Sequence, residues 1–449
     1  MDKTAVCKSA VEKYRQLILD AERYIWKHPE TGYREVGTSK YMQEQFEALG
    51  YELVLAGDIP GFYTVLDTGS PGPEILVMAE LDSLINSAHP ECDPETSAVH
   101  SCGHHAQCAA MLGLAAALKE PGVLDGLCGR IRLCAVPAEE LIEIEYRSEL
   151  RRQGVIKFYG GKQEFMRRGY FDGVDFGFMV HTRTGGKFVA TYGAVGCIAK
   201  QVRYKGVSAH AGGSPWFGRN ALYAASLGLQ AVNSIRETFK EQDYIRVHPI
   251  ITKGGDAVNA IPADVRIESF IRGRTFEAMQ KANKVVNRAF TGTALSLGVN
   301  VETIDAPGYA PYTNDPRAVE LAAEALALCC PEEEFVRPTT VGTGSTDMGD
   351  IAQVMPFVYL HAAGAAGVGH GSDYRIDDPE RACVKSALWQ LTILQLMLSD
   401  DAKRAKEICE NYETPFPSIK AYTDYLESVF AEGDRLSYNE DETLAEAKI

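Results

Sequence analysis

The stretch HSCGHHAQCAAMLGLAAALKE, residues 100–120, places candidate metal ligands directly before a predicted helix. Cys102 and His104 are separated by a single glycine, so a turn can direct both side chains toward one point. The small-residue run that follows predicts a helix ending near Pro121. A helix N-terminus favours a thiolate, and a bound metal would favour it further. Buried cysteines and histidines also occur near helix starts, so this stretch alone leaves a structural role open.

Polar residues follow three apolar segments that have the composition of buried strands. The segments EILVMAEL, IRLCAV and VDFGFMV lead to Asp82, to the pair Glu139 and Glu140, and to His181. Strands interleaved with helices predict an α/β layer, and ligands collect beyond the carboxyl ends of strands in such sheets. A Glu-Glu pair is usually solvated surface, but this pair directly follows an apolar strand. We therefore treat these residues as candidates for one shared site.

The pattern changes over residues 193–305. Strand-like and helix-like segments follow one another there in the order β-α-β-β-α-β, the arrangement of a ferredoxin-like unit. The sequence thus predicts an α/β fold with a discontinuous metal-binding domain, residues 1–192 and 306–449, interrupted by an inserted α+β domain, residues 193–305. The charged tail after Phe430 is expected to be partly disordered.

The bulk composition narrows the possible functions. The chain has 449 residues, a net charge of −16 and 11 cysteines, enough length for two domains. The negative charge argues against nucleic acid and anionic membranes as main partners. The scattered cysteines, which include adjacent Cys329 and Cys330, do not form a disulfide framework and indicate a reducing compartment. With no signal-peptide core and no apolar run of about 20 residues, we expect a cytoplasmic protein without a membrane span.

Pooling the strand-end and loop residues gives one candidate metal centre. Its members are Cys102, His104, Glu140, His181 and His370, with Asp82 and Glu139 beside them. Thiolate, imidazole and carboxylate donors together suit zinc or manganese. The set is too large for one tetrahedral metal that keeps a water, but it suits two divalent metal ions about 4 Å apart. Such a pair lowers the pKa of water toward about 7, and one of the adjacent glutamates can serve as general base.

Ordered motifs along most of the chain resemble a known enzyme family. They are WKHPETGYRE (26–35), AELDSL (79–84), HSCGHHAQCAAMLG (100–113), PAEE (137–140), DFGFMVH (175–181), GGDAVNAIPADVRIESFIRG (254–273), GSTDMGD (344–350) and GHGSDYRIDD (369–378). The set resembles the aminoacylase/carboxypeptidase amidohydrolases of peptidase clan MH, metallopeptidase family twenty. It is most similar to the branch with a cysteine metal ligand, which includes the aminobenzoyl-glutamate and indole-acetyl-amino-acid hydrolases.

The resemblance implies a metal-binding α/β domain interrupted by a lid domain that usually also dimerises. By motif, Cys102 matches the bridging metal ligand. The terminal metal ligands are matched by His104, Glu140, His181 and His370. Glu139 matches the general base, and Asp82 matches a residue that orients the metal site.

The resemblance also assigns roles to residues of the lid. His210 matches a histidine that reaches a neighbouring subunit's site to steady the oxyanion. Asn259 and Arg272 match residues that hold the substrate's carbonyl or carboxylate. Without the resemblance, His210 would be interpreted as a solvated loop histidine and Arg272 as a partner of surface carboxylates.

The chain departs from the family pattern at several positions. Glu80 stands where aspartate is usual, Thr346 stands where many members have glutamate, and His370 is followed by Gly-Ser rather than His-Pro. The segment 142–161 is longer than in the commonest members. It carries Arg147, Arg151, Arg152 and Lys157. We hypothesise that these cations draw an acidic substrate to an otherwise acidic protein.

The sequence therefore predicts a dinuclear, metal-dependent amidohydrolase. Its substrate is expected to be an N-acyl or N-aroyl amino acid similar to aminobenzoyl-glutamate, and its partner a second copy bound through the lid. A dipeptidase acting on unusual dipeptides is an alternative within enzymes. A non-catalytic assembly or binding chain, paired with a homologous hydrolase, is the alternative from another class.

Overall fold

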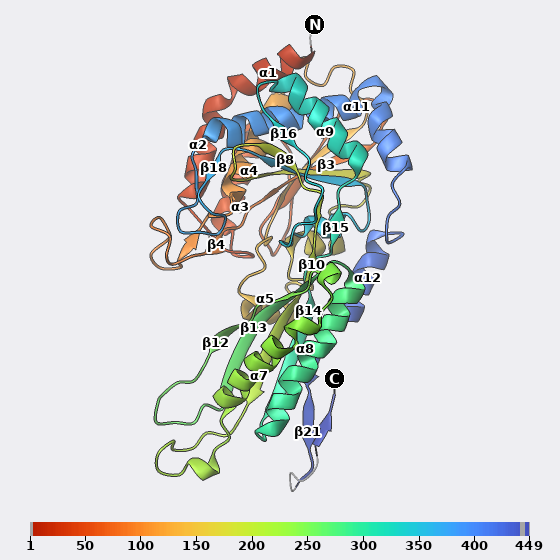
Figure 1. The fold of residues 1–449 in the computed structure, drawn as a ribbon. Helices are drawn as coiled ribbons and strands as arrows, with labels where there is room; N and C mark the ends of the chain where they lie inside the picture. Colours follow the sequence, from red (N-terminus) through yellow and green to blue (C-terminus); the bar gives the residue numbers. More distant parts are fainter. Residues whose placement is uncertain (1–2, 441–444, 449) are drawn as a thin grey trace.

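The computed structural model describes residues 3–440 and 445–448 and has two parts (Figure 1). The upper part, the first domain, is built on an eight-stranded sheet, and the lower part, the lid domain, on a six-stranded sheet. This arrangement confirms the predicted α/β fold with an inserted α+β domain.

The sheet of the first domain has the order β1-β2-β6-β3-β7-β17-β8-β16. Its strands are β1 (Val54–Leu55), β2 (Phe62–Asp67), β3 (Glu74–Glu80), β6 (Arg130–Val136), β7 (Phe176–Thr182), β8 (Phe188–Ala190), β16 (Phe335–Val336) and β17 (Phe357–Ala362). The four central strands β6, β3, β7 and β17 run parallel. Strands β3 and β7 are buried along their whole length, which explains their continuous apolar runs. Their carboxyl ends meet at one edge of the sheet.

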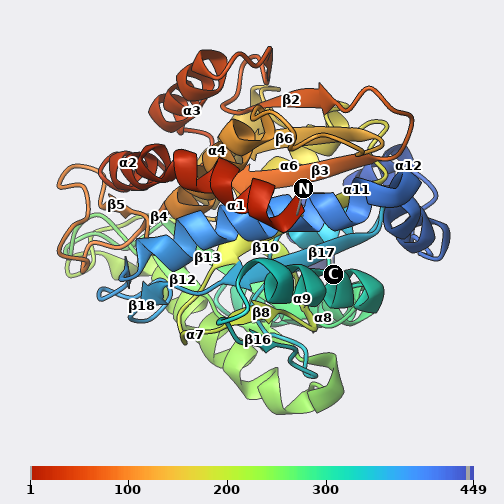
Figure 2. The same ribbon diagram turned by 90° about the horizontal axis from the view of Figure 1, so that it is seen from above.

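Helices cover both faces of this sheet. The helices of the first domain are α1 (Lys3–Lys13), α2 (Arg15–Trp26), α3 (Val36–Ala48), α4 (His104–Leu118), α5 (Ile144–Arg152), α6 (Gly161–Arg167), α9 (Pro316–Cys329), α10 (Met348–Ile351), α11 (Ser386–Glu410) and α12 (Ile419–Val429). Of these, α5 and α12 lie toward the lid, where they contact β10 and β14. Figure 2 shows α1, α4 and α11 crossing above the strands. Every residue of α4 is buried. Its alanines and glycine allow this close approach on all sides, as the small-residue run predicts.

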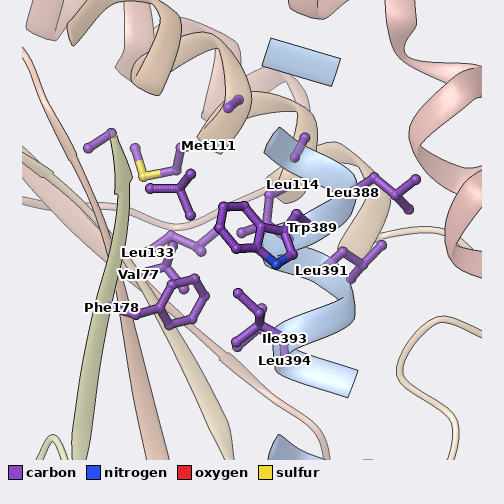
Figure 3. Close-up of a cluster of buried hydrophobic side chains, with 14 of the residues drawn as sticks. Val77, Met111, Leu114, Leu133, Phe178, Leu388, Trp389, Leu391, Ile393 and Leu394 are labelled. Atoms are coloured by element: carbon purple, nitrogen blue, oxygen red, sulfur yellow. The ribbon is translucent and has the colours of Figure 1, made fainter. Parts of the chain in front are cut away.

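Trp389 of α11 lies in the core of the first domain, where its ring meets Phe188 of β8 and Phe335 of β16 edge-on, with 5.3 and 5.8 Å between ring centroids. Figure 3 shows Trp389 in the same buried cluster as Met111 and Leu114 of α4 and the strand residues Val77 and Phe178. Its indole nitrogen donates to the Ala322 carbonyl oxygen at 2.7 Å, so the polar atom is satisfied inside the core. These contacts join α11 to α9 and to the edge strands β8 and β16.

The lid domain has the sheet order β11-β13-β10-β14-β20, with β12 also paired to β13. Its elements are β10 (Gly196–Lys205), α7 (Ala221–Ile235), β11 (Arg246–Val247), β12 (Ile250–Lys253), β13 (Asp264–Gly273), α8 (Phe276–Ser296), β14 (Asn300–Pro307) and β20 (Ala431–Asp434). Helices α7 and α8 begin at side-chain caps, Asn220 and Thr275. They pack on each other and on the sheet. The order is the predicted β-α-β-β-α-β, except that the first of the two strands expected between the helices is divided into the short strands β11 and β12.

The C-terminal segment differs from its expectation as a partly disordered tail of the first domain. Strand β20 pairs with β14 of the lid over Glu302–Asp305. Arg435 donates to Thr303 Oγ1 at 2.6 Å and pairs with Asp305 at 3.2 Å. The edge of β14 needs a hydrogen-bonding partner, and the tail supplies one. The part of this tail at residues 441–444 lies outside the described residues.

The remaining elements are short. They are β4 (Leu84–Ile85), β5 (Ala98–Val99), β9 (Gly193–Ala194), β15 (Tyr312–Thr313), β18 (Ala365–Ala366), β19 (Arg375–Ile376), β21 (Leu436–Tyr438) and β22 (Ala445–Ala447), with single helical turns at Pro215–Phe217, Arg236–Thr238 and Glu241–Asp243 and a π-helical turn at Glu380–Lys385 before α11. By length and composition, the helical segment Glu380–Glu410 could cross a membrane, but 83% of its most apolar window is buried inside the protein. It has the burial of a core helix.

Candidate metal centre

The side chains predicted to bind metal converge at the carboxyl edge of the central strands. Three overlapping groups each keep their ligand atoms within 4.8 Å of one another. The groups are Cys102, His104 and His181; Cys102, Glu140 and His370; and Glu80, His104 and Glu139. Cys102 and His104 each belong to two groups, so the stretch between β5 and α4 lies at the centre of the site.

Gly103 allows Cys102 and His104 to face the same point. Its φ of 112° lies in the left-handed region that favours glycine. A Cβ at this position would also clash with the Tyr374 hydroxyl. That hydroxyl donates to the Cys102 carbonyl oxygen at 3.0 Å, which fixes the turn from the opposite side.

His104 begins α4 and is held by Asp82. Its Nδ1 lies 2.8 Å from the Asp82 carbonyl oxygen and 3.2 Å from Asp82 Oδ1. Donation through Nδ1 leaves Nε2 as the ligand atom, which faces Glu80 at 3.2 Å and Glu139 at 3.8 Å. The second carboxylate oxygen of Asp82 accepts from the Glu140 backbone nitrogen at 2.7 Å. Asp82 therefore positions two predicted ligands at once.

Cys102 faces His181 across the site. Its Sγ lies 3.4 Å from His181 Nε2, while His181 Nδ1 lies 2.5 Å from the Thr182 carbonyl oxygen. Burial and Glu140 act to raise the pKa of the Cys102 thiol, but His104 and His181 outweigh them and hold it at about 6. A thiol with this pKa is largely a thiolate at neutral pH, the form that binds metal.

Glu140 and His370 close the other side of the site. His370 Nε2 lies 3.2 Å from Glu140 Oε1. The His370 backbone has a φ of 63°, and its nitrogen donates to the Ser101 carbonyl oxygen at 2.8 Å. Burial would raise the pKa of Glu140, but His370 outweighs burial and lowers it to about 2. Glu140 in turn raises the pKa of His370 to about 11.

Glu139 points away from its neighbour Glu140. It lies on the His104 side, and its backbone oxygen accepts from the Tyr309 hydroxyl. Burial first, and then the carboxylates Glu80 and Glu140, raise the pKa of Glu139 well above its usual range. A carboxyl group with this environment is suited to exchanging a proton during a reaction.

A buried lysine beneath the site was not predicted from the sequence. Lys162 of α6 is fully buried, lies 2.5 Å from Glu80 Oε1 and forms an ion pair with Asp347. Burial would raise the pKa of Glu80, but Lys162 outweighs burial and lowers it to about 2. The other carboxylate oxygen of Glu80 accepts from Gln107 Nε2 at 2.9 Å. Two departures from the family pattern in the sequence, Glu80 and Thr346 next to Asp347, were the signals that this region is unusual.

The cations of segment 142–161 do not line the cavity at the metal site, and their attraction of an acidic substrate stays a prediction. Arg147 is fully buried and donates to the Tyr159 carbonyl oxygen at 2.6 Å and to the Glu140 carbonyl oxygen. Arg151 pairs with Glu427 at 2.9 Å, and Arg152 pairs with Glu149. Arg147 therefore fixes the backbone of a ligand, and none of these residues lines the cavity at the metal site.

That cavity has a volume of about 640 Å³, and Cys102, His181 and His370 open onto it. Its far wall is the loop around residues 338–342. His361 of β17 also lines it, with its ring 5.5 Å from that of His181. Burial, then His181 and the Arg183 guanidinium, hold the pKa of His361 well below its usual range. The volume lies in the range of small-molecule pockets.

The predicted substrate-binding residues of the lid lie apart from this cavity. His210 and Asn259 are exposed on neighbouring lid loops, joined by the Ala211 nitrogen and the Asn259 carbonyl oxygen at 2.9 Å. Neither lines the cavity. Arg272 of β13 instead reaches the first domain, where its guanidinium donates to Ser345 Oγ at 2.9 Å.

The converging residues fit a divalent metal. His104 Nε2 and Glu140 Oε1 are buried and find no hydrogen-bond partner among the described residues. Such atoms are costly to bury unless something else satisfies them, and a cation would do so. Their donor set of thiolate, imidazole and carboxylate matches the ligands that zinc and related divalent ions take in proteins.

Comparison with known proteins places the chain among hydrolases. The family described as Peptidase family M20/M25/M40 matches residues 76–395. One of the two p-aminobenzoyl-glutamate hydrolase chains of Escherichia coli K12 is 29% identical over 310 residues, covering 65% of this chain and 58% of the relative. The chain thus matches less than two thirds of that relative's length. The indole-3-acetyl-aspartic acid hydrolase of Enterobacter agglomerans is 25% identical over 391 residues, covering 70% of this chain and 84% of the relative.

Solved structures share the fold. An aminobenzoyl-glutamate utilization protein from Klebsiella pneumoniae superposes with a TM-score of 0.64 at 20% identity, covering 85% of this chain and 96% of that one. A dinuclear metal-binding M20 peptidase from Bacillus subtilis gives a TM-score of 0.61 at 19% identity, covering 86% and 99%. The family match extends from β3 into α11 and includes all the converging ligands. The protein therefore belongs to peptidase family M20/M25/M40.

Proposed function

We propose that this protein is a metal-dependent amidohydrolase that cleaves the amide bond of an N-acyl or N-aroyl amino acid. Its family and its named relatives hydrolyse amide bonds, which supports the reaction class. The observation that carries the proposal is the convergence of a complete ligand set around Glu139, a carboxylate free to handle a proton.

The ligand set is proposed to hold two divalent metal ions, zinc or manganese. His104 and His181 would hold one ion and Glu140 and His370 the other, with the Cys102 thiolate available to both. The overlap of two donor groups at Cys102 supports this division, as does the dinuclear site named for the Bacillus subtilis neighbour. Bound there, the ions would polarise the substrate carbonyl, lower the pKa of water and favour the ionised form of Glu139.

The protein's own residues then move the protons. Glu139 accepts a proton as the water oxygen attacks the amide carbon, and it returns that proton to the nitrogen as the carbon–nitrogen bond breaks. The acyl half leaves as a carboxylic acid and the other half as an amine. Asp82 keeps the geometry through its contacts with His104 and with the Glu140 backbone.

The metal content of Cys102→Ala tests this proposal. Elemental analysis should find about two metals per chain in wild type and a loss of metal, together with hydrolysis of an N-acyl amino acid panel, in the variant. Cys128→Ala is a matched control because Cys128 lies outside the site, and it should retain both. Wild-type protein that stays metal-free after reconstitution would overturn the proposal.

The variant Glu139→Gln tests whether Glu139 is the general base or a metal ligand. The variant should keep its metals and lose activity by about 10²–10⁴-fold, the usual contribution of general acid–base catalysis. Elemental analysis and steady-state kinetics on the same sample measure both quantities. Loss of metal from this variant would show that Glu139 is a ligand instead.

The lid is proposed to form a homodimer, through which His210 would reach the partner's site with Asn259 and Arg272 contacting substrate. The exposure of His210 and Asn259 away from their own metal cavity supports action across a dimer. Trp216, Phe217 and Tyr223 expose 73%, 72% and 65% of their surface on the lid, which supports a contact there.

The free cysteines support a reducing, cytoplasmic location.

A second candidate function is a dipeptidase. The Xaa-Arg dipeptidase of Mus musculus is 26% identical over 367 residues, covering 78% of each chain, which favours it. Comparing kcat/KM for N-acyl amino acids with that for free-amine dipeptides distinguishes the two.

Two relatives are named as the different chains of one hydrolase, so a non-catalytic partner chain is the alternative of another class. The complete ligand set around Glu139 argues against it.

A further inference from the structure

Arg183 is a cation on the wall of the metal cavity without an acidic partner. Its side chain is exposed and lines the cavity together with Cys102, His181 and His370. Its Nε lies 3.4 Å from the Thr184 carbonyl oxygen, and no carboxylate of the described residues pairs with it. Arg381, by contrast, pairs with Glu333.

The fold fixes Arg183 close to the reacting centre. His181 and Arg183 are two residues apart at the end of β7, and alternate residues of an extended segment point the same way. The Arg183 nitrogen donates to the Ala362 carbonyl oxygen at 2.9 Å, so the extended pairing with β17 continues past His181. The Arg183 side chain lines the same cavity as the His361 ring. Arg183 therefore lies beside a predicted metal ligand, on the same side of the chain.

The charge of the cavity wall is unusual for this protein. The chain carries a net charge of −16, yet no aspartate or glutamate of the described residues lines the cavity. An acidic protein repels anions at long range, so an anionic substrate needs a local cation to be held. Among the described residues that line this cavity, Arg183 is the one arginine or lysine.

We propose that Arg183 is a specificity-determining residue that binds a carboxylate of the substrate, so that the enzyme selects N-acyl amino acids carrying an acidic group beyond the α-carboxylate. This inference rests on the proposed amidohydrolase function. The planar guanidinium presents paired N–H donors that match the two oxygens of a carboxylate. The carboxylate can belong to the amino-acid half, as in an N-acyl glutamate, or to the acyl half, as in a succinyl amino acid.

Matched substrates that differ only in charge test the proposal. N-acetyl-glutamate is compared with N-acetyl-glutamine, and succinyl-alanine with succinamoyl-alanine, by kcat/KM. Wild type should prefer the acidic member of one pair by about 10- to 100-fold, the effect of a hydrogen bond to a charged group. In Arg183→Met that preference should disappear through a higher KM for the acidic member, and in Arg183→Lys part of it should remain. The pair that shows the preference locates the carboxylate.

Lys187→Met is the matched control. Lys187 is an exposed cation of the same loop, but it pairs with Glu334 at 2.7 Å and does not line the cavity, so this variant should keep the preference. Equal kcat/KM within both substrate pairs in wild type, or an unchanged preference in Arg183→Met, would overturn the inference while leaving the amidohydrolase function intact.

Binding measurements separate the inference from the proposed function. If wild type hydrolyses none of these substrates, the proposed function fails. Calorimetric binding of N-acetyl-glutamate against N-acetyl-glutamine, and of succinate against succinamate, then still decides the role of Arg183. Tighter binding of an acidic ligand that is lost in Arg183→Met supports it, and equal binding of both ligands in each pair overturns it.

Discussion

Lys162, beneath the metal centre, is the counter-charge of two buried carboxylates. Its ammonium group is completely buried between Glu80 and Asp347, and both carboxylates are themselves almost inaccessible. Burial raises the pKa of Asp347 to about 6 even though Lys162 opposes it. Without the lysine, Asp347 would lose its ion-pair partner, and the His104 imidazole would be the cation left in contact with Glu80.

Lys162→Met should be strongly destabilising. Breaking a buried ion pair by removing one partner leaves an uncompensated charge and typically costs about 3–5 kcal/mol. Urea unfolding of the metal-free protein, followed by circular dichroism, measures the change in unfolding free energy. Lys187→Met, which removes an exposed lysine, should change it by less than about 0.5 kcal/mol. Equal stability of the two variants would contradict the role of Lys162 as a buried counter-charge.

The Glu140–His370 pair should make the stability of the metal-free protein depend on pH. The pKa of Glu140 falls from 4.5 to about 2 on folding, so its contribution is present above pH 4.5 and lost as pH falls toward 2. The pKa of His370 rises from 6.5 to about 11, so its contribution is present below pH 6.5 and lost as pH rises toward 11. The pair should therefore stabilise most between pH 4.5 and 6.5.

The difference in unfolding free energy between wild type and His370→Gln, measured in chelator, reports this contribution. It should be largest near pH 5.5 and should shrink steadily toward pH 9. A difference that stays constant over this range would show that the pair is not coupled as the structure indicates. Metal affinity should move the other way and rise with pH, because His370 must lose its proton to bind.

At the scale of elements, the end of β6 and the start of α6 are packed against each other without space. A Cβ on Gly161 would overlap the Pro137 carbonyl oxygen, just before the loop that carries Glu139 and Glu140. The backbone of Ala138 has a φ of 59°, and its nitrogen donates to Glu35 Oε1 at 2.7 Å. The predicted ligand Glu140 and the predicted base Glu139 thus follow a strand end that α6 packs against.

Gly161→Ala should therefore displace the strand end and lower both stability and metal affinity. Overpacking of a filled site costs about 1–3 kcal/mol. Gly292→Ala is the matched control, because Gly292 lies exposed within α8 and nothing is within 4 Å of the added Cβ. That change should stabilise the protein by up to about 1 kcal/mol through helix propensity. Thermal unfolding and elemental analysis measure both variants, and a change of the same sign in both would show that Gly161 is not tightly packed.

At the scale of the whole molecule, the first domain places the metal centre and the lid presents an apolar surface. Figure 1 shows α7 and β12 at the outer side of the lid, away from the eight-stranded sheet. Tyr223 of α7 and Val258 border one hollow there, and Val258 is fully exposed. Strand β12 pairs with β13, and the described residues supply no partner for its other edge. Apolar side chains beside an open strand edge are the features of a contact surface.

Replacing Trp216 and Tyr223 together by glutamate should convert a dimer into a monomer. Charges buried in an apolar contact are costly, and the exposed positions tolerate the change in a free chain. Sedimentation velocity measures the state of each protein. Val36→Glu, at an exposed apolar residue of the first domain, should leave the dimer intact. A wild-type chain that sediments as a monomer at high concentration would remove the basis for the proposed dimer.

The sequence by itself determined the features that depend on local pattern. The spacing of Cys102 and His104 across a glycine, and the position of Glu139, Glu140 and His181 after apolar strands, predicted residues that the fold brings together. The β-α-β-β-α-β order of the lid was also readable, because hydrophobic periodicity and turn residues act over short distances. Parallel strands bring their carboxyl ends to one edge, so strand-end residues meet whatever the detailed packing.

Only the tertiary structure decided which charged side chains contact one another. Lys162 contacts Glu80 and Asp347 across 82 and 185 residues of sequence, and the tail at Ala431–Asp434 joins the lid rather than the first domain. It also decided that the arginines of segment 142–161 face away from the cavity while Arg183 faces into it. The local sequence around a charged residue does not reveal whether its side chain is buried, paired or free. Its role follows from the distant segments that the fold places around it.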